Sequence, residues 1–362
     1  MSTPPDPPIV APSAGIWYRV WRVLRYVIGL AAVGAAIWAV TGKTDELRGA
    51  TTYLAHMRWW WVAVAVGAEA ASYLAYSSLQ RRLLLAGAVR VRMPPMLGIS
   101  LAGMAIQYSL PGGVVFYAAY AFRQYRRFGA SDVLAGWTLI AVNALSFVTL
   151  TLMATVGLGM ALSTGSAYDL VEAILGVVIV AILMVLAWAE RARLLPHLAR
   201  SLRLSQRVIR RPDPSQTPEA IIGGWLDQVG AISPGHADWA WAGTMAMSNW
   251  IADLGCLTFS FFAVGAGVPW RGLLLAYGAG QLASILPFTP GGLGVVEGSL
   301  TVALVTFGGG QDSTVAAVLL YRLISFWLLL PVGWGAWTAM LLAGRRRSSR
   351  APDEAKAEAV PT

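Results

Sequence analysis

Two charged side chains, Glu297 and Arg322, stand inside strongly apolar stretches of the chain. If these stretches lie in a membrane, each charge costs about 2.5–3.5 kcal/mol to insert, so it normally has a partner or a function. The planar guanidinium group of an arginine matches the oxygens of a phosphate group. We therefore expect Arg322 to contact a substrate phosphate, with Glu297 orienting it or exchanging a proton. The alternative is a structural ion pair between two segments.

Two Pro-Gly-Gly sequences, at residues 111–113 and 290–292, interrupt apolar stretches that are each too short to cross a membrane alone. Broken backbone at membrane depth is tolerated only where protein or a water-filled cavity covers it, and glycine lets a ligand approach the backbone closely. The alternative is an interfacial loop or a kinked helix. The predicted substrate-binding residues are Arg322, Glu297, Pro290, Gly291, Gly292, Pro111, Gly112, Gly113, Asn143 and Arg123.

Three further polar residues, Glu69, Asn249 and Asp253, also fall in apolar segments. We expect them to form hydrogen bonds between helices, and the alternative is that they line the same cavity. The single Cys256 and the three widely spaced histidines predict neither a metal site nor a disulfide within the chain. No nucleophile or metal-ligand spacing suggests catalysis, so the sequence predicts neither an enzyme nor a cofactor.

The composition places these residues in a membrane protein. The chain of 362 residues is 57% hydrophobic and 12% charged, with a mean hydropathy of +0.60. Soluble domains carry about twice that share of charged residues. The predicted fold is therefore an all-α polytopic membrane protein, with a disordered tail at 1–18, a membrane domain at 19–343 and a disordered cytoplasmic tail at 344–362.

The arginines predict the topology. With each long span crossing once and each Pro-Gly-Gly unit entering and leaving on one side, nearly all of the 27 Lys and Arg residues fall on one side, taken as cytoplasmic. Only Lys43, Arg48, Arg58 and Arg271 fall outside. This arrangement gives about six full spans and two re-entrant helix pairs, with both termini cytoplasmic. The predicted spans are about 26–40, 59–79, 133–162, 170–189, 239–264 and 314–342, with a basic cytoplasmic linker at 190–238.

The two halves of the membrane domain resemble each other. At a shift of 179 residues, Pro111-Gly112-Gly113 aligns with Pro290-Gly291-Gly292, Ser146-Phe147 with Ser325-Phe326, and Asn143 with Arg322. The two breaks enter from opposite sides in the predicted topology. The sequence therefore predicts inverted repeats, at about 59–162 and 239–342, of the kind found in transporters.

The second break carries a resemblance to a known family. The run Pro287-Phe288-Thr289-Pro290-Gly291-Gly292-Leu293-Gly294 with Glu297, followed by Arg322-Leu323-Ile324-Ser325-Phe326-Trp327, resembles the membrane region of lysylphosphatidylglycerol synthases and of flippase-like relatives. The resemblance covers about residues 18–343. Val114-Val115-Phe116-Tyr117 stands where that family often has a glycine and an acidic residue. The resemblance implies movement of a lipid between leaflets, without the aminoacyl-transferase domain of the synthases.

The leading hypothesis is therefore a translocator of a phospholipid or lipid-linked precursor in a bacterial inner membrane, with a cavity between the two breaks. The expected partners are membrane lipids with an anionic or phosphate-bearing headgroup. No nucleic acid is expected, and an oligomer is compatible with the sequence. Two alternatives are a small-solute or ion-coupled transporter, and a membrane partner of an envelope-biosynthesis enzyme that docks through the 190–238 segment.

Overall fold

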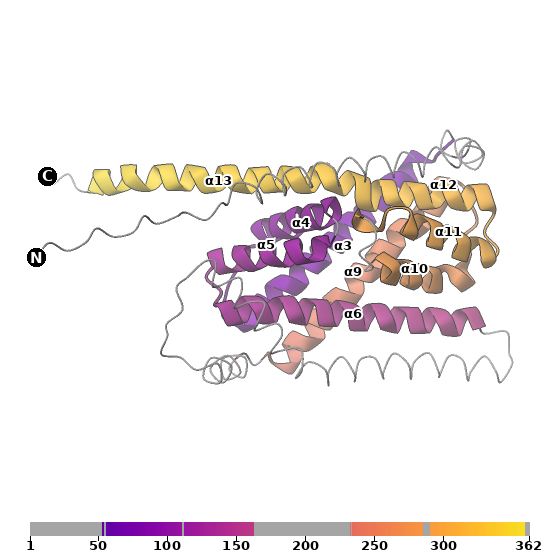
Figure 1. Ribbon diagram of the computed structural model, residues 1–362, viewed down its shortest axis with the longest axis horizontal. Coiled ribbons are helices and arrows are strands. Elements are labelled where there is room, and N and C mark those ends of the chain that lie inside the picture. The colour runs from indigo at the N-terminus through magenta and orange to yellow at the C-terminus, as the bar shows by residue number, and fades with distance from the viewer. Residues whose placement is uncertain are drawn as a thin grey trace, which may run out of the picture. The chain divides into compact units, whose positions relative to one another are not determined.

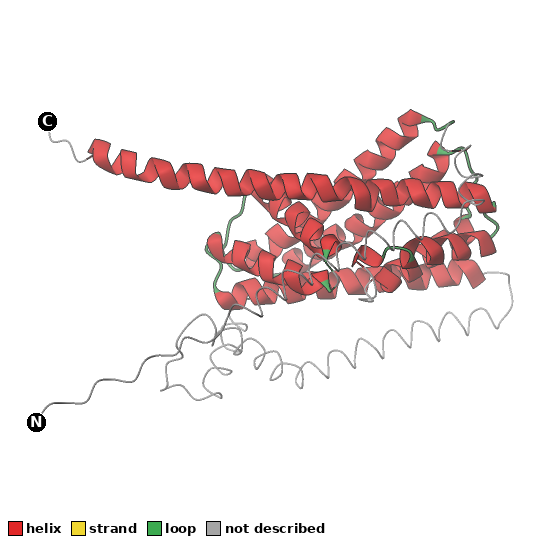
Figure 2. Cartoon of the chain, turned by 45° about the horizontal axis from the view of Figure 1, so that its top comes forward, coloured by secondary structure: helices red, strands yellow, loops and turns green. Residues whose placement is uncertain are grey.

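The computed structural model describes residues 53, 56–110, 112–162, 232, 234–284 and 290–358, without the side chains of residues 283, 290 and 344–358. The predicted spans at 26–40 and 170–189, Pro111 and most of the 190–238 linker lie outside the described residues. The described part contains helices and loops and no strand (Figures 1 and 2). Its elements are α3 (Trp59–Ala86), α4 (Met93–Ser109), α5 (Gly113–Arg127), α6 (Asp132–Leu162), α9 (His236–Ala263), α10 (Trp270–Ser284), the 3₁₀ turn η1 (Pro290–Gly292), α11 (Val295–Thr306), α12 (Gln311–Arg322), the π-helix η2 (Leu323–Leu328) and α13 (Leu329–Glu358).

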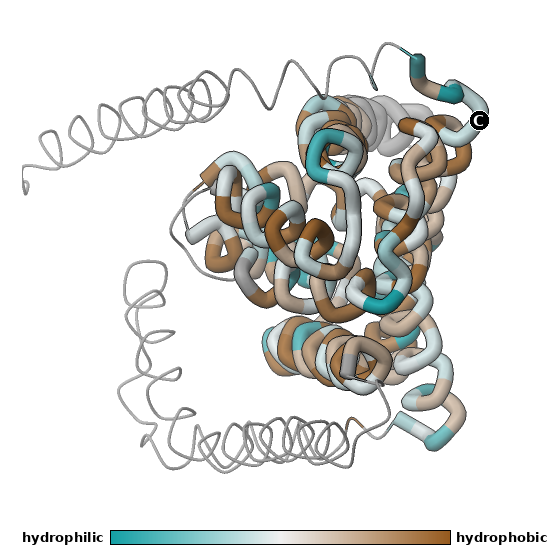
Figure 3. Tube along the Cα trace, turned by 90° about the vertical axis from the view of Figure 1, so that its right-hand side faces the viewer, coloured by the Kyte–Doolittle hydropathy of each residue, from teal (hydrophilic) through white to brown (hydrophobic). Residues whose placement is uncertain are grey.

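Three of the described helices are long and apolar enough to cross a membrane. They are Trp59–Ala86, Asp132–Ala161 and Gln311–Ala343, which agree with three of the predicted spans. Helix α9 also has 28 residues but is not one of these three, and polar side chains such as Asn249 and Asp253 lie along it. Hydrophobic residues predominate along the described helices, as Figure 3 shows. The part of the chain that the structure describes is therefore all-helical, with the long apolar helices of an integral membrane protein.

The last long helix differs from the prediction in two respects. A π-helical segment, η2, directly follows Arg322, and such segments occur often at functional sites. The helix also continues through Glu358, whereas an irregular tail was expected from residue 344 onward. The final residues are rich in Ala, Arg, Lys and Glu, which favour helix formation even without an apolar face.

The two halves of the described chain repeat the same local conformations. Helices α3 and α9 both have 28 residues, and their first residues are 177 positions apart. Gly112 and Gly291, which align at the breaks, have φ angles of 64° and 59°. Gly129 and Gly308, which also align, have φ angles of 94° and 96°. These conformations favour glycine, so the two sequences place equivalent turns at equivalent points.

Contacts between the halves are reciprocal. Ser72 and Asn249, at equivalent positions of α3 and α9, contact each other at 3.2 Å. Helix α10 packs against α6, and α4 packs against α13. The repeat aligns α4 with α10 and α6 with the last long helix, so each of these two contacts is the counterpart of the other. Figure 1 shows α6 and α13 running in opposite directions. Equivalent residues that meet each other are the signature of a two-fold arrangement.

Apolar packing is divided into two clusters. One lies around the end of α3, the start of α9 and helices α4 and α5, and includes Leu79 and Tyr125. The other lies around the start of α3, the end of α9 and helices α10–α12, and includes Leu257 and Tyr321. Between the clusters, near the middle of α3, α6 and α9, the side chains are polar. This arrangement places a polar region at the mid-length of the longest helices.

Candidate functional site

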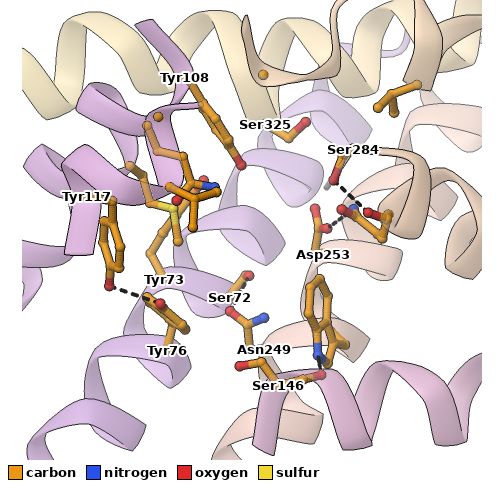
Figure 4. A pocket seen from close by; sticks show the side chains of 18 of the residues that line it. Ser72, Tyr73, Tyr76, Tyr108, Tyr117, Ser146, Asn249, Asp253, Ser284 and Ser325 are labelled. Atoms are coloured by element: carbon orange, nitrogen blue, oxygen red, sulfur yellow. Dashed lines mark hydrogen bonds between the residues drawn. The ribbon is translucent and has the colours of Figure 1, made fainter. Parts of the chain in front are cut away.

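A cavity of about 400 Å³ occupies the polar region between the two apolar clusters. Figure 4 shows Tyr73, Tyr108, Asp253 and Ser325 around it, from four different elements. The lining includes glycines of both breaks. The cavity is lined by Glu69, Ser72, Tyr73, Tyr76, Met104, Gln107, Tyr108, Leu110, Gly112, Gly113, Val114, Tyr117, Asn143, Ser146, Phe147, Leu150, Asn249, Trp250, Asp253, Gln281, Ser284, Gly291, Val296, Tyr321, Arg322 and Ser325.

Arg322 borders this cavity and is fixed by three contacts. Its Nε donates to Oε1 of Glu297 at 2.6 Å, and its Nη2 donates to the carbonyl oxygen of Gly291 at 2.9 Å. The guanidinium carbon lies 4.7 Å from the centre of the Phe326 ring. Arg322 is only 7% exposed, so its charge depends on these partners. The arginine therefore ties α12 to the second break at the edge of the cavity.

Glu297 has a structural role of its own. Its Oε2 accepts a hydrogen bond of 2.6 Å from the backbone N–H of Gly294, at the start of α11. A carboxylate at a helix N-terminus satisfies a free N–H group and complements the helix dipole. The ion pair between Glu297 and Arg322, which was the alternative to phosphate binding, is present. Arg322 lines the cavity, whereas Glu297 does not.

A second polar centre surrounds Asp253 on α9. Oδ2 of Asp253 accepts hydrogen bonds from the Tyr277 hydroxyl at 2.5 Å and from Nε2 of Gln281 at 3.0 Å. The Tyr321 hydroxyl lies 3.1 Å from both carboxyl oxygens. Glu69 of α3 faces Asp253. The expected hydrogen bonding between helices is therefore observed for Asp253, and both acids also line the cavity.

The first half supplies a neutral hydrogen-bond network. The hydroxyls of Tyr76 and Tyr117 lie 2.9 Å apart (Figure 4). Tyr125 donates to Oε1 of Gln80 at 2.7 Å. These groups are buried, and Tyr76 and Tyr117 extend to the cavity wall. The wall can thus present hydroxyl groups on one side and charged groups on the other.

The cavity reaches the surface between the first break and α6. Four of its lining residues are exposed there: Gly112, Val114, Asn143 and Phe147. Val114 is 49% exposed and Phe147 is 39% exposed, and apolar neighbours such as Val115 are exposed too. The exposed part of the lining therefore includes the apolar side chains of Val114 and Phe147, whereas the charged residues of the lining, Glu69, Asp253 and Arg322, are buried.

The structure brings most of the predicted residues together. Arg322, Gly291, Gly112, Gly113 and Asn143 line the cavity, and Glu297 contacts Arg322. Gly292 is buried beside the second break but is not in the lining, and Pro290 is described by its backbone alone.

Arg123 does not reach the cavity, because it lies exposed on α5. Its place in the last turns of that helix, after the apolar residues, explains this position. The tyrosine hydroxyls of the wall were not predicted as site residues. Their signal was weak, since tyrosine is common at membrane interfaces and in cores alike. Within the described residues, no group of three His, Cys, Asp or Glu side chains could hold a metal ion.

Comparison with known proteins places this architecture in a family. An 82-residue stretch is 35% identical to a "UPF0104 membrane protein" of Methanothermobacter thermautotrophicus, covering 23% of this chain and 23% of that protein. The chain thus matches about a quarter of the length of this curated relative. Residues 26–333 match the family described as the lysylphosphatidylglycerol synthase TM region. Because this match includes both breaks, the cavity and Arg322, the chain belongs to the lysylphosphatidylglycerol synthase TM region family.

Proposed function

We propose that the protein translocates a lipid with an anionic or phosphate-bearing headgroup between the leaflets of a bacterial inner membrane. The observation that carries the proposal is the mid-length cavity bordered by both glycine breaks and by Arg322. A volume of about 400 Å³ suits a headgroup but not its acyl chains. The headgroup enters the cavity while the chains stay in the surrounding lipid.

The helix pairs at the breaks are proposed to be re-entrant. The longest of these four helices, α4, has 17 residues and is therefore about 26 Å long, against about 30 Å for the hydrocarbon core. The Cβ of a residue replacing Gly272, near the start of α10, would overlap the Phe307 ring at the end of α11. The end of α11 therefore lies beside the start of α10. A hairpin that enters and leaves on one side accounts for both observations.

The two ends of the described helices support the proposed orientation. Arg81, Arg92 and Arg127 are exposed, and they lie near the C-terminal ends of α3 and α5 and the start of α4. The opposite end of α3 carries Trp59 and Trp60, which are 72% and 68% exposed. Basic residues favour the cytoplasmic side and tryptophans favour the interface. We therefore place the basic end in the cytoplasm, and the breaks then belong to inverted repeats.

The exposed apolar residues of the lining favour a lipid over a small solute. A water-soluble solute needs a polar entry path, whereas the exposed side chains of Val114 and Phe147 are compatible with contact to acyl chains. Arg322 offers a charge for the headgroup, and the tyrosine hydroxyls offer neutral hydrogen bonds. In this proposal the protein binds and moves its substrate without altering a covalent bond, so it is not an enzyme.

The proposal is tested by translocation in proteoliposomes. Fluorescent phosphatidylglycerol is placed in both leaflets, and a membrane-impermeant reductant quenches only the outer leaflet. Translocation by the purified protein makes the whole pool accessible. Arg322→Ala should reduce the rate at least tenfold for the anionic lipid, because the cavity loses its cation. Arg123→Ala is the matched control, since that arginine is exposed and outside the cavity.

Two results would overturn this function. Equal rates for wild type, folded Arg322→Ala and protein-free vesicles would show that the protein does not translocate phosphatidylglycerol. Uptake of free phosphate, dependent on Arg322 but without lipid movement, would instead identify a solute transporter. Both measurements use the same vesicles, so they separate the two functions directly.

A further inference from the structure

The cavity wall contains a pair of buried acids that the phosphate-binding role of Arg322 does not use. Glu69 of α3 is 7% exposed and Asp253 of α9 is 8% exposed. Their side chains face each other in the most extensive helix contact of the described chain, between α3 and α9. Two ionised carboxylates in such a place repel each other and lack water, so one of them retains a proton.

The hydrogen bonds around the pair show where that proton belongs. Every oxygen of Asp253 already accepts a hydrogen bond, from Tyr277, Gln281 or Tyr321. By contrast, Oε2 of Glu69 is buried without a hydrogen-bond partner among the described residues. A buried carboxylate oxygen without a donor is costly, whereas a protonated carboxyl at this point can donate to the acid opposite. The geometry thus calls for a proton on Glu69.

The other groups that face the pair come from five helices. Among these neighbours, the guanidinium of Arg322 is the one cation. It interacts electrostatically with Asp253 but is already bound to Glu297. The remaining neighbours are hydroxyls and one thiol. The titratable and charged groups around Glu69 and Asp253 are Tyr73 on α3, Tyr108 on α4, Cys256 on α9, Tyr277 on α10, and Tyr321 and Arg322 on α12.

The repeat indicates that packing alone does not require these acids. Glu69 is equivalent to Ala246 in the second half, and Asp253 is equivalent to Tyr76 in the first. Ala246 and Tyr76 are both buried in the same kind of helix contact. The equivalent places are therefore filled stably by a methyl group and by a phenol. A costly carboxyl pair that the fold can do without points to a function.

We infer that Glu69 and Asp253 form a proton-binding site in the wall of the cavity, and that proton uptake accompanies binding of an anionic headgroup. The second part rests on the proposed function. With one proton the pair carries a single negative charge a short way from Arg322, and this charge opposes an incoming anion. A second proton from water removes it. By linkage, headgroup binding and protonation then strengthen each other equally.

The proton site is tested first, without any lipid substrate. Infrared difference spectra of the purified full chain in detergent, recorded between about pH 6 and about pH 10, where exposed Asp and Glu side chains stay ionised, should contain the carbonyl band of a protonated carboxyl group. Glu69→Gln should remove that band, and Asp253→Asn should shift the pH at which it appears. Asp238→Asn should leave it, because Asp238 lies outside the cavity in an ion pair with Arg82. Gel filtration and circular dichroism verify that each variant is folded.

Three results would overturn the proton site: no such band in that pH range, a band that is unchanged in both folded variants, or loss of the band on adding sodium ions at constant pH and ionic strength. The last result would identify a cation site. Because two acids are tested separately, failure of one variant to fold leaves the other decisive.

The coupling is tested in the phosphatidylglycerol proteoliposomes. If one proton is linked to headgroup binding, the translocation rate of wild type should fall by up to about tenfold for each unit by which the pH rises, over part of the pH range. Folded Glu69→Gln and Asp253→Asn should translocate with a flat pH profile. An unchanged slope in both would overturn the coupling. Absence of translocation in every sample would overturn the proposed function, while the infrared result would still stand on its own.

Discussion

Gly291 and Gly112 offer a comparison within one molecule, because they occupy equivalent positions with nearly equal φ angles of 59° and 64°. An alanine at either position must adopt a left-handed conformation, which costs about 1–2 kcal/mol. The surroundings differ. A Cβ at Gly112 meets nothing within 4 Å, whereas a Cβ at Gly291 overlaps the ring of Phe326. Overpacking of this kind costs about 1–3 kcal/mol more.

We therefore expect Gly291→Ala to lower the free energy of unfolding by about 2–5 kcal/mol and Gly112→Ala by about 1–2 kcal/mol. Thermal unfolding in detergent can be followed through Cys256, the single cysteine of the chain, which is fully buried. A fluorogenic maleimide reacts with it only after unfolding. At about 2–4 °C per kcal/mol, the midpoints of the two variants should differ by about 2–12 °C.

Phe326→Ala supplies the decisive control. In that background the ring is absent, so Gly291→Ala should cost no more than Gly112→Ala. Contacting residues are expected to be non-additive in this way. Equal midpoints for the two single alanine variants, or a difference that persists without the ring, would refute the assignment of the cost to the Gly291–Phe326 contact.

Three further predictions follow from buried and exposed contacts. Arg322→Asn should lower the free energy of unfolding by about 3–5 kcal/mol, because it leaves Glu297 unpaired, and adding Glu297→Ala should recover part of this loss. A double variant whose melting midpoint falls by the sum of the two single shifts would contradict this prediction. Cys256 should resist maleimide in folded protein and react at once in denaturant, and fast labelling without denaturant would contradict its burial. Arg82→Ala should change the unfolding free energy by less than about 1 kcal/mol, because its ion pair with Asp238 is partly exposed, and a large shift of the midpoint would contradict that.

Hydropathy and arginine placement were sufficient to predict the long helices. Three of the predicted spans agree with helices able to cross a membrane, and α9 lies where a fourth was expected. The bounds of α4, α5, α10 and α11 also follow from the glycines and prolines, which interrupt the helical hydrogen bonds at known points. These features are local, so the sequence carries them directly.

The site was less accessible to sequence reasoning, because it depends on which helices meet. The pairing of Glu297 with Arg322 was expected, since two intramembrane charges need partners. The capping of α11 by Glu297 and the contact of Gly291 with Arg322 depend on the exact turn at the break. The π-helix after Arg322 has no clear sequence signal. Arg123 was grouped with the site by proximity in sequence, whereas its helix carries it to an exposed face.

The buried charges break the resemblance between the two halves. Under the repeat, Glu69 corresponds to Ala246, Asp253 to Tyr76, Glu297 to Ala118 and Arg322 to Asn143. Every one of these four charged residues thus has a neutral counterpart.

The backbone turns at Gly112 and Gly291 are the same, so the turns themselves do not require the four charges, although Glu297 and Arg322 stabilise the second break. The repeat accordingly accounts for the backbone that the two halves share, and the four positions at which a charged residue has a neutral counterpart are the ones that we associate with function. The two acids and Arg322 all line the cavity, and in the two proposals above their charges are balanced by a proton and by an anionic headgroup. The asymmetry therefore supports a site that binds charge, within a scaffold that only needs to be symmetric.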